Sequence, residues 1–331
     1  MSITIRDVAR RAGVSISTVS RVLNGSSPVR EDKRDRVIEA SEALGYAPNP
    51  AALSLLGKRT GGVGALLPFV SGEFFSELLG GLDQAAQSLE RFLVVSTSHR
   101  KPDEFARIVR ALDKRVDGLV VMAPELDSAA AASLLRASAP TVFLNTFAEG
   151  IEADMFNFDN AGGTRALTGH LIRHGHRRIA FAAGPPLAGD SQERARGYRE
   201  AMDSAGLQPR QADAGYTRQA GADAARALIR STTPPTAIVA ANDECALGAI
   251  LALREDGLSV PHDVSVVGFD DIPAAAHTTP SLTTVRVPIR DLGEQAVRQL
   301  AARIEGEDIG PPRHVVMPVE VVIRESTAPL P

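Results

Sequence analysis

From residue 61 onward, short apolar runs alternate with helix-length amphipathic segments, and this alternation constrains the fold more than any other feature. The strand-like runs lie at 61–70, 92–98, 117–124, 141–145, 177–184, 236–243 and 263–271. The segments of helical periodicity lie at 76–90, 103–114, 161–174, 191–205, 217–231 and 243–256. Such alternation predicts parallel sheets with helices on both faces.

Seven strands are more than one compact half needs, so we expect an α/β body made of two doubly wound parallel-sheet lobes. The extended stretch at 156–160 is a candidate connection between the lobes. The tail at 283–326 should add one helix and a final strand.

Residues 1–60 lack this alternation and instead predict a small all-α head of three short helices. Thr4 can cap the first helix, with Asp7 at its third position as a variant of the capping box, and Gly13 ends it. Ser15 can cap the second helix, and the third runs from about 30 to 44. The inward-facing positions are Val8, Ala9, Ala12, Val19, Val22, Leu23, Val37, Ala40 and Leu44.

Two helices joined by a tight glycine turn, the second with a polar start, are typical of a helix-turn-helix. In that geometry the second helix enters the major groove of DNA. Hydroxyls suit phosphate oxygens, Arg21 can reach a guanine edge, and Ile16 can contact a thymine methyl. The candidate DNA contacts in the head are Thr4, Ser15, Ile16, Ser17, Thr18, Ser20, Arg21 and Asn24. The alternative is a small helical bundle with polar caps.

The distribution of charge separates the head from the body. Residues 1–60 hold ten basic and six acidic side chains, a net charge of +4, whereas the remainder holds 26 and 34, a net charge of −8. A basic head on an acidic body indicates a polyanionic partner for the head alone. The alternative is a solvated, salt-bridged surface.

The sequence contains no apolar run of transmembrane length and no signal-peptide core at its start. Its single cysteine, Cys245, cannot form an intrachain disulfide, which fits a reducing compartment. We therefore expect a cytoplasmic protein without a membrane partner.

The motifs of the head and body together resemble the lactose-repressor (LacI/GalR) family of transcriptional regulators. The head contains "TIRDVARRAGVSISTVSRVLNG" and "VREDKRDRVIEASEALGYAPN", and "VSxxTVSRVLN" is the most specific part. The body contains "FFSELLGGLDQAA", "DNAGGTRALTGHLIRHGHRRIAF", "AIVAANDECALGAI" and "GLSVPHDVSVVGFDD" in the order usual for the family. The resemblance covers residues 3 to 326. It implies a periplasmic-binding-protein-like body.

The resemblance also implies three parts: a DNA-binding helix-turn-helix domain at 1–48, a hinge helix at 49–59, and an effector-binding and dimerisation domain at 60–331. In the hinge, Asn49 would cap the helix and Leu55 would wedge into the minor groove, which kinks the duplex. Leu53 stands where the family usually has arginine. This departure would weaken phosphate contacts or add an apolar contact between two hinges.

In the family, an effector sits in the cleft between the lobes, and matching positions here are Phe74, Phe75, Met122, Asn145, Phe158, Arg194, Tyr216, Asn242 and Asp270. Asp and Asn bind hydroxyls, Arg gives a fork of donors, and aromatic faces cover apolar sugar faces. Arg194 and Asp270 could share a ligand, since a buried charge needs a partner. For Phe158, core packing is an equal alternative.

Departures from the family pattern limit what the resemblance implies about the effector. Gly72 and Glu73 stand where Asn-Pro is frequent, Met122 stands at an often polar position, and Asn145-Thr146 replaces Asp-Arg. A sugar or sugar derivative is the base expectation, with a nucleobase or an acidic metabolite as alternatives.

Other motifs do not favour catalysis or a metal. His174 and His176 are two residues apart, which is poor helical spacing for a shared metal, and "GGVGALL" lacks the third glycine of a dinucleotide fingerprint. The acidic "AND" and "FDD" end two predicted strands without a nucleophile–base pair, so binding is the better interpretation. We expect no enzyme, cofactor or metal.

These observations predict a repressor that binds a palindromic operator in double-stranded DNA as a homodimer under the control of a small effector. The chain ends in "STAPLP" without a leucine heptad, which favours a dimer over a tetramer. A solute-binding protein and an enzyme acting on a sugar are the rival interpretations. A solute-binding protein would need a signal peptide, which this sequence does not show. An enzyme acting on a sugar would need a pair of acid and base carboxylates, which we do not identify.

Overall fold

The protein is described by a computed structural model that covers residues 3–24, 29–46, 59–99, 102–112, 115–125, 139–147 and 152–330. The chain divides into two compact units, a head at 1–60 and a body at 61–331. The expected hinge residues Asn49 and Leu55 lie outside the described residues. The domain boundaries at 48 and 59 therefore stay a prediction.

The head consists of three helices around one small core. They are α1 (Ile5–Ala12), α2 (Ile16–Asn24) and α3 (Glu31–Leu44). Asp7 accepts hydrogen bonds from the Thr4 hydroxyl at 2.7 Å and from the Thr4 backbone N–H at 3.0 Å, and these bonds lower the pKa of Asp7. Gly13, with φ of 64°, ends α1 in the left-handed region that glycine adopts without strain. The predicted core positions are buried or partly buried.

Lobe one of the body is a parallel six-stranded sheet in the order β11-β5-β4-β3-β1-β2. Its strands are β1 (Gly62–Leu67), β2 (Phe92–Thr97), β3 (Gly118–Met122), β4 (Thr141–Leu144), β5 (Asp154–Phe158) and β11 (His314–Met317). Its helices are α5 (Glu73–Ser88), α6 (Pro102–Leu112) and α13 (Ile289–Glu305).

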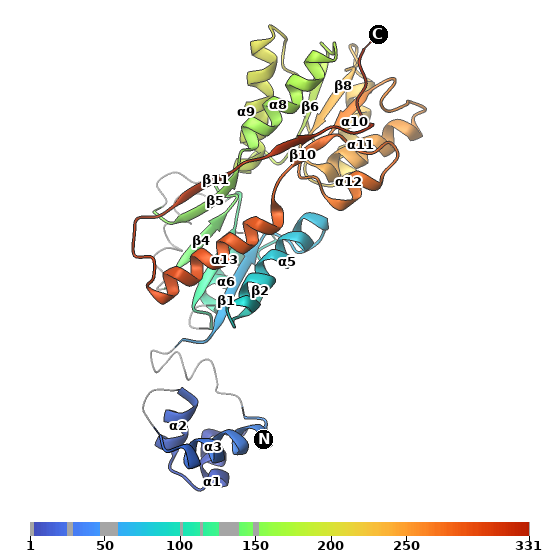
Figure 1. Ribbon diagram of the computed structural model, residues 1–331. Helices are drawn as coiled ribbons and strands as arrows, with labels where there is room; N and C mark the ends of the chain where they lie inside the picture. The colour runs from blue at the N-terminus through green and yellow to red at the C-terminus, as the bar shows by residue number, and fades with distance from the viewer. Residues whose placement is uncertain are drawn as a thin grey trace. The chain divides into compact units, whose positions relative to one another are not determined.

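The two faces of this sheet bury different helices because strand side chains alternate with a period of two. Leu67, Val120 and Leu144 belong to the cluster that contains α5 and α13, which lie side by side in Figure 1. Leu66 and Val121 belong instead to the cluster that contains α6. Both faces are thus covered, as the continuous apolar runs predicted.

Lobe two is a parallel four-stranded sheet in the order β7-β6-β8-β9. Its strands are β6 (Ile179–Ala183), β7 (Gln211–Asp213), β8 (Ala237–Ala240) and β9 (Ser265–Val267). Its helices are α8 (Asn160–Arg173), α9 (Gly189–Ser204), α10 (Arg218–Ile229), α11 (Asp243–Glu255) and the short α12 (Pro273–His277). Phe181 packs with α8 and α9, whereas Ala180 and Ala182 pack with α10 and α11.

Three chain segments join the lobes. The first is Asp159, between β5 and α8, so the stretch expected to be a connection is also a strand of the first sheet. The second lies between β10 (Thr284–Arg286) and α13. The third lies between β11 and β12 (Glu320–Val322).

The expected single final strand is wrong. Its residues form two strands in different sheets, with β11 parallel to β5 and β12 antiparallel to β10. Pro318 stands between them, and proline lacks the N–H that a continuous strand would need.

The C-terminal tail is held against lobe two by the side chains of two histidines and the backbone carbonyl of a third, His174, which accepts the Leu330 N–H at 2.8 Å. His170 and His176 are buried, and their rings contact the Thr327 hydroxyl at 3.2 Å and the Ala328 carbonyl at 3.1 Å. The rings of His170 and His174 lie 4.1 Å apart, centre to centre. Burial, helped by these basic neighbours, lowers the pKa of His170 from 6.5 to about 4.

This cluster predicts acid sensitivity. Between its unfolded pKa of 6.5 and its folded pKa of about 4, His170 takes up a proton in the unfolded chain but not in the folded one. Stability from His170 is therefore complete above the higher value and declines as the pH falls toward the lower one. We expect a loss of about 1–2 kcal/mol between pH 7 and pH 5, measured by urea unfolding. His170→Gln should remove this component, and an unchanged pH dependence in that variant would contradict it.

Within the described ranges, each helix is too short or too polar to cross a bilayer.

Candidate functional site

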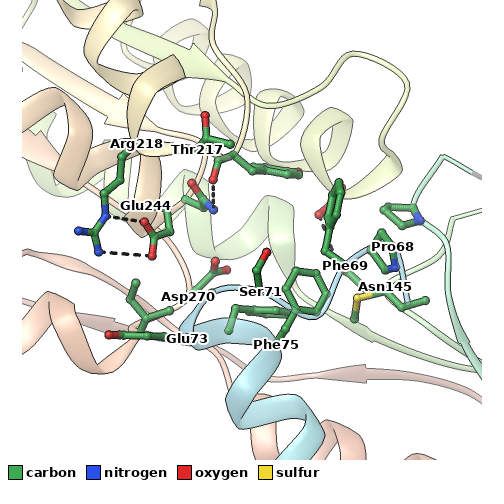
Figure 2. Close-up of a pocket in the computed structure, with 18 of the residues that line it drawn as sticks. Pro68, Phe69, Ser71, Glu73, Phe75, Asn145, Thr217, Arg218, Glu244 and Asp270 are labelled. Carbon is green, nitrogen blue, oxygen red and sulfur yellow. Dashed lines mark hydrogen bonds and ion pairs between the residues drawn. The ribbon is translucent and has the colours of Figure 1, made fainter. Parts of the chain in front are cut away.

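A cavity of about 510 Å³ lies between the lobes of the body, and Figure 2 shows its wall. Residues from lobe one end β3, follow β1, β3 and β4, or begin α5. Residues from lobe two begin α9, α10 and α11 or follow β7, β8 and β9. The cavity therefore meets the carboxyl ends of parallel strands from both sheets, where open α/β sheets place ligands.

Eight of the nine residues predicted to bind an effector line this cavity. They are Phe74, Phe75, Met122, Asn145, Arg194, Tyr216, Asn242 and Asp270. Their role in binding stays a prediction.

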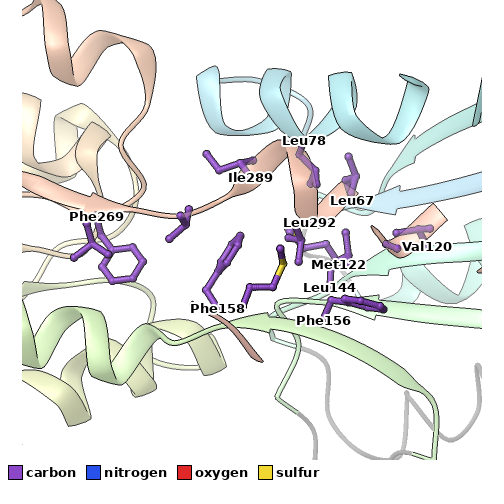
Figure 3. Packing of buried hydrophobic residues seen from close by; sticks show 14 of the residues in the cluster. Leu67, Leu78, Val120, Met122, Leu144, Phe156, Phe158, Phe269, Ile289 and Leu292 are labelled. Atoms are coloured by element: carbon purple, nitrogen blue, oxygen red, sulfur yellow. The ribbon is translucent and has the colours of Figure 1, made fainter. Parts of the chain in front are cut away.

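Phe158 is the exception, because it does not line the cavity. Its side chain is 2% exposed and belongs to the main hydrophobic cluster, where Figure 3 shows it among residues such as Met122 and Ile289. It is the last residue of β5, directly before the crossing at Asp159, and its cluster contains residues of both lobes, so it packs at their junction. The position of Phe158 therefore matches core packing, the alternative to effector binding.

Arg194 is the most buried charged group of the wall. Its side chain donates from Nε to Asn160 at 2.8 Å, from one terminal nitrogen to the Ala241 carbonyl at 2.5 Å, and from the other to Asp270 at 3.2 Å. Its guanidinium carbon lies 3.8 Å from the centre of the Phe269 ring. Coulombic attraction to Asp270 keeps the pKa of Arg194 raised although burial opposes its charge.

Asp270 and its neighbour Asp243 are buried carboxyl groups. Burial raises the pKa of Asp270 to about 7, with Arg194 opposing that rise and Asp190 adding to it. Burial also raises the pKa of Asp243 well above its usual range. Asp243 accepts the Thr284 hydroxyl at 2.5 Å and a backbone N–H, so it holds β10 against the start of α11.

Asp190 is a site residue that the sequence analysis missed. It is 5% exposed, lines the cavity, and accepts the Asn145 side-chain N–H at 3.1 Å, which joins lobe two to lobe one. It precedes Arg194 by four residues in α9 and so shares its helix face. That spacing from an expected site residue was the available signal. Burial and the charge of Asp190 together raise the pKa of Tyr216 well above its usual range.

Glu73 is a second missed residue, at the position where the family pattern departs. Its Oε2 accepts the backbone N–H of Ala274 in lobe two at 2.7 Å. The backbone N–H of Gly189 likewise donates to the Pro124 carbonyl of lobe one at 2.9 Å. With the Asn145–Asp190 bond, these contacts hold the lobes together around the cavity.

The head presents a polar face at the start of α2. Thr4, Ser15, Ile16, Ser17 and Arg21 are exposed, whereas Thr18 and Ser20 are half-buried. Ser15 caps α2 by accepting the Thr18 backbone N–H at 3.2 Å. Ile16 is 46% exposed although apolar. The side chain of Asn24 lies outside what the structure describes.

The described residues contain no group of three or more His, Cys, Asp or Glu side chains placed to hold a metal ion. Burial raises the pKa of Cys245 to about 12, so its thiol stays protonated and unreactive at neutral pH.

Comparisons with known proteins agree with this architecture. A family model described as "Bacterial regulatory proteins, lacI family" matches residues 4–49, and one described as "Periplasmic binding protein-like domain" matches residues 168–327. Catabolite control protein A of Priestia megaterium is 32% identical over 99% of this chain and 100% of its own length. The repressor CytR of Escherichia coli is 31% identical over 99% of this chain and 97% of its own.

Solved structures show the same similarity over the whole chain. The lac repressor dimer bound to operator and the anti-inducer ONPF matches with a TM-score of 0.87 at 31% identity, over 99% of this chain and 100% of that one. The regulator CelR in complex with cellobiose matches with a TM-score of 0.74 at 33% identity, over 98% and 100%. These relatives are transcriptional regulators and not enzymes. The chain belongs to the LacI family of bacterial regulatory proteins.

Proposed function

We propose that this protein is a cytoplasmic transcriptional repressor that binds a palindromic operator as a homodimer and responds to a small effector, a sugar or sugar derivative, in the cleft. The observation that carries the proposal is the presence, in one chain, of a helix-turn-helix head and a two-lobed body whose cavity has an apolar, partly aromatic wall and several buried polar side chains. Full-length similarity to the operator-bound lac repressor supports it.

The proposed parts have separate tasks. The domain at 1–48 reads the operator through α2, the hinge at 49–59 bends its centre, and the domain at 60–331 dimerises and binds the effector. Because the effector and the operator act on one dimer, their affinities are linked reciprocally. The CelR–cellobiose complex and a ribose-bound regulator from Enterococcus faecium support a sugar-like effector.

Selection of binding sites from random duplex DNA tests this function. The full-length protein should enrich inverted repeats, because a two-fold dimer presents two heads to two half-sites. The mass of the protein–DNA complex should correspond to two chains on one duplex. Enrichment of no sequence, or of single half-sites bound by one chain, would contradict the proposal.

Arg21→Ala tests base recognition by the head. Arg21 is exposed on α2 and lies one helical turn after Ser17, on the face presented to DNA. Its loss should weaken operator binding by roughly 1–3 kcal/mol and relax the preference at one base pair. Fluorescence anisotropy with the operator and with single-base variants measures both. An equal loss on all sequences would mean that Arg21 contacts phosphate only.

A further inference from the structure

The charged side chains of the cavity wall are mostly acidic. Among the described lining residues, two arginines, Arg194 and Arg218, face four carboxyl groups, those of Glu73, Asp190, Glu244 and Asp270. The wall thus carries two negative charges in excess. Even if Asp270 takes up a proton, one remains in excess.

Neither arginine offers an uncompensated positive charge. Arg194 is held by Asp270, Asn160 and a backbone carbonyl. Arg218 donates from Nε to Glu244 at 2.6 Å, a pair that Figure 2 shows at the edge of the site. A phosphate or carboxylate would therefore enter a site of its own sign, and such repulsion is strong where water is excluded.

The carboxyl groups can instead accept hydroxyl donors. Asp190 accepts one N–H from Asn145 and one from the Ser191 backbone, whereas two carboxylate oxygens offer about four acceptor positions. Asn145 and Asn242 add amide groups. Most of this polar set belongs to α9 and the strand ends of lobe two.

Lobe one supplies an apolar wall opposite this polar edge. It consists of Pro68, Phe69, Phe74, Phe75, Met122 and Pro124. The Phe75 ring lies 6.5 Å from that of Phe69 and 5.3 Å from that of Phe74, both edge to face. Figure 2 shows Phe69 and Phe75 on one side of the cavity. A flat apolar or aromatic group fits such a surface.

We infer, on the basis of the proposed function, that the effector is an uncharged glycoside. Its hydroxyl-bearing ring contacts the carboxyl and amide groups of lobe two, and its apolar or aromatic substituent packs on the phenylalanines of lobe one. Phosphorylated sugars and organic acids are excluded by the acidic wall.

Matched probes test this inference on the full-length protein. Glucose, galactose and mannose are each compared as the free sugar, the phenyl glycoside and the 6-phosphate, with citrate as an organic acid. Calorimetry and thermal unfolding report binding. For at least one sugar, the phenyl glycoside should bind roughly tenfold more tightly than the free sugar and the 6-phosphate more weakly than either. Tighter binding of a phosphate or of citrate, or no binding by any glycoside, would overturn the inference.

Two variants and one control separate the effect of the acidic wall from that of the apolar wall. Asp190→Asn keeps a polar group but removes one negative charge, so it should reduce discrimination against the 6-phosphate by roughly tenfold. Asp203→Asn, an exposed carboxylate on the same helix, should leave that ratio unchanged. Phe75→Leu should weaken the phenyl glycoside more than the free sugar. Unchanged ratios in Asp190→Asn and Phe75→Leu would remove the proposed causes.

Operator binding by the same preparations distinguishes this inference from the proposed function. If the protein binds an operator but prefers an anionic ligand, the inference of an uncharged effector fails and the proposed function as a transcriptional repressor stands. If no inverted repeat is bound either, the proposed function fails with it.

Discussion

Arg194→Leu should lower the free energy of unfolding by about 3–5 kcal/mol and abolish effector binding. The substitution leaves Asp270 buried without its cation and leaves Asn160 and the Ala241 carbonyl without their donor. An unpaired charge in that environment is costly, so Asp270 should become protonated at neutral pH. Urea unfolding measures the loss of stability, and thermal shifts with an identified effector measure the loss of binding.

The exposed Arg165 provides the matched control. It donates to Glu200 at 2.8 Å with 54% of its side chain exposed, so Arg165→Leu should cost less than about 1 kcal/mol. Adding Asp270→Asn to Arg194→Leu should restore part of the stability, because the uncompensated carboxyl group is then gone. Equal costs for the two arginines, or no recovery in the double variant, would contradict the role of the buried pair.

The prediction of the body from sequence succeeded where periodicity is strong. The run at 117–124 contains β3, whose five residues are all buried. The segment at 191–205 covers most of α9, which buries Ala195, Tyr198 and Met202 at helical spacing. The sequence did not predict β7, whose three residues carry too little pattern. The split of the final strand depends on which sheet each half joins, and the local pattern does not encode that choice.

Site residues that belong to family motifs were predicted, and a site residue at which this chain departs from those motifs was missed. Asp270 and Arg194 follow from motifs, and the structure places both in the cavity wall. Glu73 could not be interpreted without its partner, because Ala274 is 201 residues away in the chain and meets it only in the folded body. Phe158 shows the reverse problem, since a resemblance marks a position but does not fix the direction of its side chain.

Gly189→Val should reduce effector affinity by about a hundredfold or more while each lobe stays folded. A side chain at Gly189 would place its first carbon 2.6 Å from Cβ of Phe147 in lobe one, closer than such atoms approach. The lobes can relieve this overlap only by separating, which breaks the Gly189–Pro124 and Asn145–Asp190 hydrogen bonds. Calorimetric titration with the effector measures the loss, and small-angle X-ray scattering detects the opening of the body.

Gly169→Val supplies the control, because it makes the same change within a helix of the same lobe. A side chain there meets only the flexible end of Arg173, at 3.3 Å. It should carry the helix cost of valine but leave effector affinity unchanged. Equal affinities for Gly189→Val and Gly169→Val would mean that the effector binds without closing the lobes at this point. A selective loss in Gly189→Val would instead show that closure contributes directly to effector affinity, and that the bare glycine at the start of α9 permits it.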